Sequence, residues 1–224
     1  MNGLHTFFVI EANMIQAFGQ SNAAGKAIVF LLIIFSVLAW TVMWGKNKEL
    51  NRLRHQNHLF EKRLSATESV LSIDPKMPGT GGPYAVLAKD ALKAYTRAQG
   101  STYSIEHVEN ALQRAVARGS VMYEGRMTLL GSIVSGAPFL GLLGTVWGVM
   151  DAFGAIAGGE GASIASLAPG VSGALLTTVA GLLVAIPSVF GYNYLLTQVK
   201  MGITELENFA SNLADRIELE AKEG

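Results

Sequence analysis

The sequence predicts an all-α integral membrane protein with three transmembrane helices and long helices that extend into the cytoplasm. Half of its 224 residues are hydrophobic, and three stretches carry no charged side chain: residues 27–45, 127–150 and 161–199. A soluble domain of this size would distribute its charges along the whole chain, so this segregation favours membrane spans. No alternating pattern of apolar and polar residues predicts a β-strand.

The first 23 residues are predicted to form a periplasmic amphipathic helix on the outer membrane surface. The alternative is a disordered arm. A signal peptide is disfavoured because the segment has no basic residue and contains Glu11. The apolar residues that recur at helical spacing are Leu4, Phe7, Phe8, Ile15 and Phe18.

We place the transmembrane helices at residues 24–45, 127–151 and 170–192. The third uncharged stretch is too long for one span, because a helix rises ~1.5 Å per residue and the hydrocarbon core is ~30 Å thick. Its first part is therefore assigned to a periplasmic loop over 152–169, and its last part to a helix that continues beyond the membrane.

The distribution of basic residues predicts the orientation. Residues 46–126 contain thirteen of the seventeen Lys and Arg, and residues 193–224 contain three more. The segment before Lys26 and the loop 152–169 contain none. By the positive-inside rule, 46–126 is a cytoplasmic helical region, 193–224 is a cytoplasmic C-terminal helix, and the N-terminus is periplasmic.

The cytoplasmic region is predicted to hold three helices. The first continues from the membrane and has one apolar face. Proline and glycine residues in 74–83 interrupt it, and the second begins at Tyr84 and ends at Gly100. Ser104 is a plausible N-cap for the third, which could continue directly into the second span. The apolar face of the first helix is formed by Leu50, Leu53, Phe60 and Leu64.

Several functional classes have little support. With no cysteine there is no disulfide, Cys-based zinc site or thiol nucleophile, and a net charge of zero gives no reason to expect nucleic acid. His55 and His58 could share a metal, but no neighbouring ligand completes the shell, so a solvated helix face is favoured. The sequence around Gly81 lacks the Gly-Lys-Ser/Thr ending of a phosphate loop. We expect no enzyme, cofactor or metal.

Two of the spans carry a stripe of small residues with a threonine near its middle. Tight helix packing alone would explain one such stripe, since threonine commonly bonds to its own helix. Two matching stripes favour a surface that receives another helix or water. The second span contributes Pro138, Gly141, Thr145 and Gly148, and the third contributes Ala174, Thr178, Gly181, Ala185 and Ser188.

Neither of these spans has a charged residue at membrane depth, and Asp151 lies at the outer end of the second. A proton carrier in the bilayer normally needs a titratable group. If the protein moves protons, that titratable group must therefore come from a partner. The threonine hydroxyls would then hydrate the group and offer it hydrogen bonds.

The stretches "APFLGLLGTVWGVMDAF" (137–153) and "LAPGVSGALLTTVAGLLVAIPSVFGYNYL" (167–195) resemble the MotA/TolQ/ExbB proton channel family, most of all its TolQ and ExbB branch. The resemblance implies a ring of five copies in the bacterial inner membrane. A dimer of single-span partners of the ExbD/TolR/MotB type would occupy its pore, each with one membrane aspartate. Proton flow, with Na⁺ not excluded, would then be converted into mechanical work across the envelope.

Residue by residue, the resemblance implies that Thr145 and Thr178, with the adjacent Thr177, line the ion path. Pro187 matches the proline of the third span, and it joins the small residues of both stripes as the expected groove for partner helices. One position departs from the family: its "APGIAEAL" glutamate is replaced by Gly173. Either the partner's aspartate suffices, or the ion path differs. A passive scaffold without ion flux and a flagellar-type, MotA-like stator are the alternatives.

Overall fold

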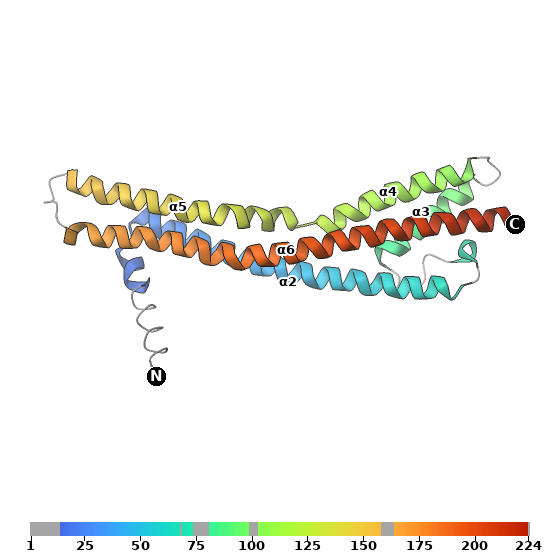
Figure 1. Ribbon diagram of the computed structural model, residues 1–224, viewed down its shortest axis with the longest axis horizontal. Helices are drawn as coiled ribbons and strands as arrows, with labels where there is room; N and C mark the ends of the chain where they lie inside the picture. Colours follow the sequence, from blue (N-terminus) through green and yellow to red (C-terminus); the bar gives the residue numbers. More distant parts are fainter. Residues whose placement is uncertain (1–13, 68, 74–80, 99–102, 158–163, 224) are drawn as a thin grey trace, which may run out of the picture. The chain divides into compact units, whose positions relative to one another are not determined.

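The structure, a computed structural model, describes residues 14–67, 69–73, 81–98, 103–157 and 164–223 (Figure 1). All regular structure within these ranges is helical, as predicted, and a short helix over 14–20 comes first. The later elements are α2 (Ala23–Ser65), the 3-10 turn η1 (Val70–Ser72), α3 (Pro83–Ala98), α4 (Ser104–Glu124), α5 (Met127–Ala157) and α6 (Ile164–Glu223).

Three helical segments are long and apolar enough to cross a membrane: Ala23–Ser65, Ser104–Ile156 and Leu167–Lys222. The prediction of three such helices is confirmed. With 43 and 60 residues, α2 and α6 are about 65 and 90 Å long at the standard rise, well beyond a ~30 Å core. The first and third predicted spans thus continue as uninterrupted helix, as expected.

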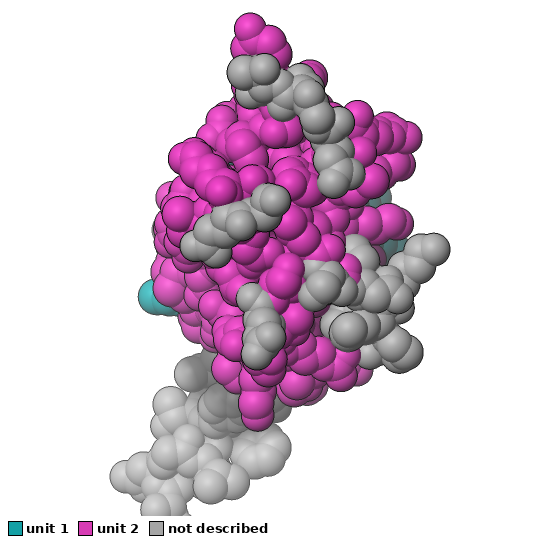
Figure 2. Space-filling view, turned by 90° about the vertical axis from the view of Figure 1, so that its right-hand side faces the viewer, with its two compact units in different colours: residues 1–43, 128–193 teal, residues 44–127, 194–224 magenta. Residues whose placement is uncertain are grey.

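The chain divides into two compact units, coloured teal and magenta in Figure 2. Unit 1 comprises residues 1–43 and 128–193, and unit 2 comprises 44–127 and 194–224. Unit 1 exposes large apolar side chains on all of its long helices, which is unusual for a protein surface in water. Examples are Phe30, Val37 and Trp40 of α2, Phe139 and Trp147 of α5, and Leu183 and Phe190 of α6.

The structure corrects two details of the predicted helix boundaries. α4 begins at Ser104 itself, and Tyr103 occupies the N-cap position that Ser104 was expected to hold. α4 also does not continue directly into α5, because Gly125 and Arg126 form a turn. Arg126 has a φ of 68°, a value that residues other than glycine adopt at an energetic cost.

Some predicted segments lie partly outside the described residues. They include positions 1–13 of the N-terminal helix, positions 74–80 of the predicted break, and positions 158–163 of the loop. Helix α3 begins at Pro83, the last residue of the predicted break and one residue before the predicted start, and a missing N–H costs nothing at this first position. α5 extends to Ala157 and α6 begins at Ile164, so the described ends of the predicted loop are helical.

The core of unit 2 contains the predicted apolar face of α2, since Leu50, Leu53, Phe60 and Leu64 are all buried. Phe209 of α6 packs edge-on against Phe60, with ring centroids 6.1 Å apart, and stacks on Tyr84 of α3 at 3.9 Å. Asn57 Nδ2 donates to Tyr123 Oη at 3.1 Å, and Asn57 Oδ1 accepts the Tyr84 N–H at 3.3 Å. Burial raises the pKa of the Tyr84 and Tyr123 phenols.

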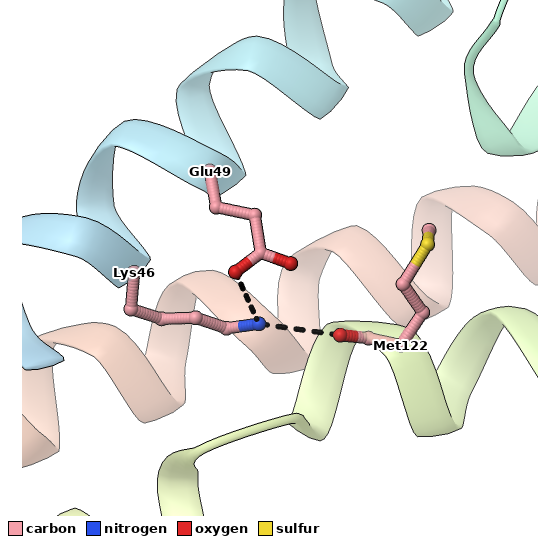
Figure 3. Close-up of polar contacts among 3 residues, drawn as sticks. All are labelled: Lys46, Glu49 and Met122. Atoms are coloured by element: carbon pink, nitrogen blue, oxygen red, sulfur yellow. Dashed lines mark hydrogen bonds and ion pairs between the residues drawn. The ribbon is translucent and has the colours of Figure 1, made fainter.

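Lys46 is completely buried in unit 2, which is rare for lysine. Figure 3 shows its ammonium group between two acceptors: Glu49 Oε2 at 3.3 Å and the Met122 carbonyl oxygen at 3.2 Å. Met122 lies in the last turn of α4, where its carbonyl oxygen also accepts the Gly125 N–H at 3.4 Å and the helix dipole favours a cation. Lys46 therefore caps the C-terminal end of α4.

We expect Lys46→Met to lower the free energy of unfolding by about 2 kcal/mol, since it removes charge-assisted hydrogen bonds but keeps most of the side-chain volume. Unfolding in detergent, followed by circular dichroism, measures this. Lys48→Met is the matched control, because Lys48 is two residues away and exposed. Equal shifts for both variants would contradict the capping role.

Glu220, near the end of α6, holds the segment that follows α2. Its carboxylate accepts hydrogen bonds from Ser69 Oγ at 2.9 Å and from the N–H groups of Val70 at 2.9 Å and Leu71 at 3.2 Å. Partial burial acts to raise the pKa of Glu220, but these three hydrogen bonds outweigh it and lower the pKa below its usual value.

This lowered pKa predicts a pH-dependent contribution to stability. Glu220 stabilises the folded state above the unfolded-state pKa, and the contribution is lost as the pH falls through the lower folded-state pKa. We expect Glu220→Gln to cost about 1 kcal/mol at pH 7, a value reduced by solvent screening, and almost nothing once the carboxyl is protonated. Thermal unfolding of both proteins at pH 7 and at a pH low enough to protonate the carboxyl measures this difference in stability. Glu218→Gln, which breaks an exposed pair with Lys222, is the control. A penalty independent of pH would contradict the prediction.

Candidate functional site

Helices α5 and α6 approach each other very closely in unit 1 because glycines face the neighbouring helix. A Cβ atom added at Gly141 of α5 would lie 2.8 Å from the Thr177 carbonyl oxygen and 3.1 Å from Thr178 Cα. One added at Gly148 would lie 2.7 Å from Ala174 Cβ. Real Cβ contacts are not this short, so only glycine fits at these positions.

The contact is reciprocal along α6. A Cβ atom at Gly181 would lie 2.7 Å from the Ala137 carbonyl oxygen and 3.1 Å from Gly141 Cα. Ala174 is buried where it meets Gly148. The small residues of the two predicted stripes thus pack against each other within one chain, as small residues do between membrane helices.

Three threonines meet at this contact and form what we call the hydroxyl cluster: Thr145, Thr177 and Thr178. The Oγ1 atoms of Thr145 and Thr178 are 2.6 Å apart, and those of Thr145 and Thr177 are 3.4 Å apart. Two carbonyl oxygens complete the cluster. Ala174 O lies 3.0 Å from Thr145 Oγ1 and 2.7 Å from Thr177 Oγ1, while Gly141 O lies 2.9 Å from Thr177 Oγ1.

The three hydroxyls differ in exposure. Thr177 is completely buried, and its hydroxyl contacts the carbonyl oxygens of Gly141 and Ala174 within the α5–α6 contact, so its predicted place in the ion path stays a prediction. Thr145 and Thr178 are half-buried, and each has a longer contact of 3.3 Å to Gly141 O besides their short mutual bond. These two hydroxyls are the ones that an incoming group can reach.

The other predicted groove residues differ in exposure. Ala185 and Ser188 are buried, and Ser188 Oγ donates to the Val184 carbonyl oxygen of its own helix at 2.7 Å. Pro138 and Pro187 lie inside helices and are half-buried. The packing alternative accounts for the glycines and alanines, and a partner-groove role for these residues stays a prediction.

Sequence reasoning missed a polar contact that joins the start of α2 to α5 and α6. Asn22 Nδ2 donates to Asp151 Oδ2 at 2.9 Å. The buried Ser21 hydroxyl contacts the carbonyl oxygens of Ala17 at 3.0 Å and Gly173 at 3.2 Å. A Cβ atom at Gly173 would lie 2.7 Å from Ser21 Oγ, so this packing has no space for a glutamate there. The one available signal was Asn22, a good N-cap residue directly before an apolar helix.

The same segments carry a family signature. A sequence model of the MotA/TolQ/ExbB proton channel family matches residues 84–208, more than half of the chain and all of the α5–α6 contact. The chain belongs to the MotA/TolQ/ExbB proton channel family. With three helices of membrane-spanning length, it is a multi-pass membrane protein.

Relatives within this family share most of the chain. The Tol-Pal system protein TolQ of Haemophilus influenzae is 27% identical over 208 residues, 89% of this chain and 91% of that protein. The biopolymer transport protein ExbB of Neisseria meningitidis is 30% identical over 217 residues, 92% of this chain and 97% of that protein. ExbB of Xanthomonas campestris is 40% identical over 143 residues, 59% and 56% of the two chains.

Proposed function

We propose that this protein is the ring-forming stator subunit of an ion-driven motor of the TolQ/ExbB type. Five copies surround two single-span partners of the ExbD/TolR type, each with one aspartate in its membrane helix. Proton flow driven by the ion-motive force turns ring and partner relative to one another, and the partner performs mechanical work across the envelope. The ring lies in the bacterial inner membrane with its N-terminus periplasmic and its C-terminus cytoplasmic, as the distribution of Lys and Arg indicates.

The observation that carries this proposal is the half-buried pair of Thr145 and Thr178 hydroxyls at the contact between two predominantly apolar helix segments. The surrounding stretches 127–150 and 161–199 contain no charged residue, so the titratable group must be supplied from outside the chain. Hydroxyl groups can give a partner carboxyl the hydrogen bonds that it would otherwise lose on entering the membrane.

The cost of placing the partner's acidic side chain in the bilayer and the energy available from the membrane potential are of similar size. An acidic side chain at the centre of the bilayer costs about 2.5 to 3.5 kcal/mol on insertion scales, and one charge crossing 100 mV gains about 2.3 kcal/mol. One or two hydrogen bonds, at about 1 kcal/mol each, are therefore enough to decide whether the partner's aspartate ionises. The wall formed by Thr145 and Thr178 is suited to that task.

A passive scaffold is the second candidate, and the glycine contacts of Gly141, Gly148 and Gly181 favour it, because they explain the small residues by packing alone. A scaffold would bind the same partners without moving ions. A flagellar-type stator would differ from the main proposal in the partner that it holds and in the work performed.

Native mass spectrometry of the purified protein, with and without a single-span partner, tests the assembly. Five copies that gain two partners support the stator. A monomer or dimer that ignores the partner would overturn it. Proton flux through the assembled complex in liposomes separates the two candidates, since a scaffold assembles but leaves an imposed pH gradient intact.

A further inference from the structure

Unit 1 contains a cavity of about 210 Å³ where the start of α2 meets α5 and α6. Its lining is polar at one end and made of small residues elsewhere. None of the eleven lining residues is basic, and one, Asp151, is acidic. They are Gln20, Asn22, Gly25, Gly144, Gly148, Asp151, Ala152, Ala155, Gly170, Gly173 and Ala174.

The polar end is organised by Asn22, which makes two hydrogen bonds. Its Oδ1 atom accepts the N–H of Gly25 at 2.7 Å, the geometry of an N-cap for α2. Its Nδ2 atom donates to Asp151 Oδ2 at 2.9 Å. Because the cap fixes the Asn22 side chain, the Asp151 carboxylate is held in a defined position at the cavity.

The other end of the cavity borders the hydroxyl cluster. Gly144 lies against Thr177, with the position of an added Cβ atom only 2.6 Å from Thr177 Cβ. Ala174, also in the lining, provides the carbonyl oxygen that Thr145 and Thr177 contact at 3.0 and 2.7 Å. The cavity therefore extends from a carboxylate to the residues that surround the proposed ion path.

Glycines keep this space open. A Cβ atom at Gly170 would lie 3.0 Å from Ala152 Cβ, and larger side chains there or at Gly173 would crowd the cavity wall. This volume is well above what a single water molecule needs, and Gln20, Asn22 and Asp151 provide polar partners for several waters.

We propose that this cavity is a water-filled entry chamber in which Asp151 concentrates small hydrated cations before they reach the Thr145–Thr178 pair. The inference rests on the proposed function, which supplies the ion flow, and it assigns a residue outside the threonines to that flow. The ion is hydronium or a monovalent metal cation of similar size. A cleft lined by one sign of charge raises the local concentration of the opposite ion by tenfold or more.

The first test uses the absence of cysteine from the natural chain. Ala155→Cys places a single thiol in the cavity wall of the complex, and its modification is timed with a cationic and an anionic methanethiosulfonate of equal size. After correction for the rates on a free thiol, we expect the cationic reagent to react about tenfold faster. Asp151→Asn in the same background should abolish this preference, and Asp151→Glu should keep it. An unreactive thiol, or an unchanged preference in the Asp151→Asn variant, would overturn the proposal.

The second test measures ion flux through the ring–partner complex in liposomes at low external ion concentration. We expect Asp151→Asn to reduce flux about tenfold and Asp151→Glu to retain it. Separate gradients of H⁺ and Na⁺ identify which cation enters. Wild-type flux in the Asp151→Asn variant would overturn the entry role. A wild-type complex with no flux at all would instead overturn the proposed function, while the thiol test still reports on the chamber.

Discussion

In the proposed stator, we expect Thr178→Val to reduce ion flux through the ring–partner complex by about tenfold while the ring still assembles. Valine has nearly the same shape as threonine, so the α5–α6 contact is kept, but the 2.6 Å bond between the Thr145 and Thr178 hydroxyls is lost. A lost hydrogen bond of about 1.4 kcal/mol at the rate-limiting position corresponds to a factor of ten. Ion flux is measured with the complex in liposomes, and ring assembly is measured by native mass spectrometry.

Two matched variants make this result interpretable. Thr178→Ser keeps the hydroxyl and should retain most of the flux. Ser135→Ala removes an exposed hydroxyl of α5 that bonds only to its own helix, at the Gly131 carbonyl oxygen, and should change little. Flux at the wild-type level in the Thr178→Val variant would show that this hydroxyl is not part of the ion path.

The second large effect is expected on folding. Gly181→Val places a branched side chain where even a Cβ atom would lie 2.7 Å from the Ala137 carbonyl oxygen and 3.1 Å from Gly141 Cα. Both neighbours are backbone, so they cannot move aside as the end of a flexible side chain could. We expect α5 and α6 to separate, with a decrease of about 3 kcal/mol in the free energy of unfolding and a large decrease in thermal stability in detergent.

Gly154→Val is the control, since an added Cβ atom there meets nothing within 4 Å. If both variants lowered the unfolding temperature equally, intrachain packing would not be the reason for Gly181. If Gly141 lines the expected groove for partner helices, Gly141→Leu should block the insertion of such a helix. The leucine side chain would meet Thr177 of the same chain, so the variant tests helix packing before it tests insertion of a partner helix.

The helical fold and its three helices of membrane-spanning length could be predicted from the sequence because they depend on patterns local to the chain. Stretches without charge show where helices are apolar enough to cross a membrane, and helical spacing identified the buried face that contains Leu50 and Phe60. Thr145 and Thr178 were likewise visible in the sequence as hydroxyl residues within small-residue stripes, and their place in the ion path stays a prediction. The structure adds that the two hydroxyls form one cluster with Thr177, whose hydroxyl contacts Thr145 and the Gly141 carbonyl oxygen.

What could not be predicted depends on contacts between distant residues. The sequence does not show that Gly141 and Gly181 face each other rather than a partner helix, because the rotation of each helix is set by packing. The contact of Asn22 with Asp151 joins residues 129 positions apart. The turn at Arg126 was also hidden, since arginine is an ordinary helix residue and its positive φ is imposed by the surrounding structure.

The short bond between Thr145 and Thr178 has a direction that either residue can set, because each hydroxyl can donate or accept. When Thr145 donates to the Ala174 carbonyl oxygen, the Thr178 proton occupies the shared bond; when Thr145 donates to Thr178, the Thr178 proton is free to point elsewhere. A visiting acid in its neutral form needs an acceptor, and in its charged form needs a donor. In the proposed stator, rotation of two O–H bonds, with no movement of any heavier atom, would let the same wall bind the partner's acid before and after it gives up its proton.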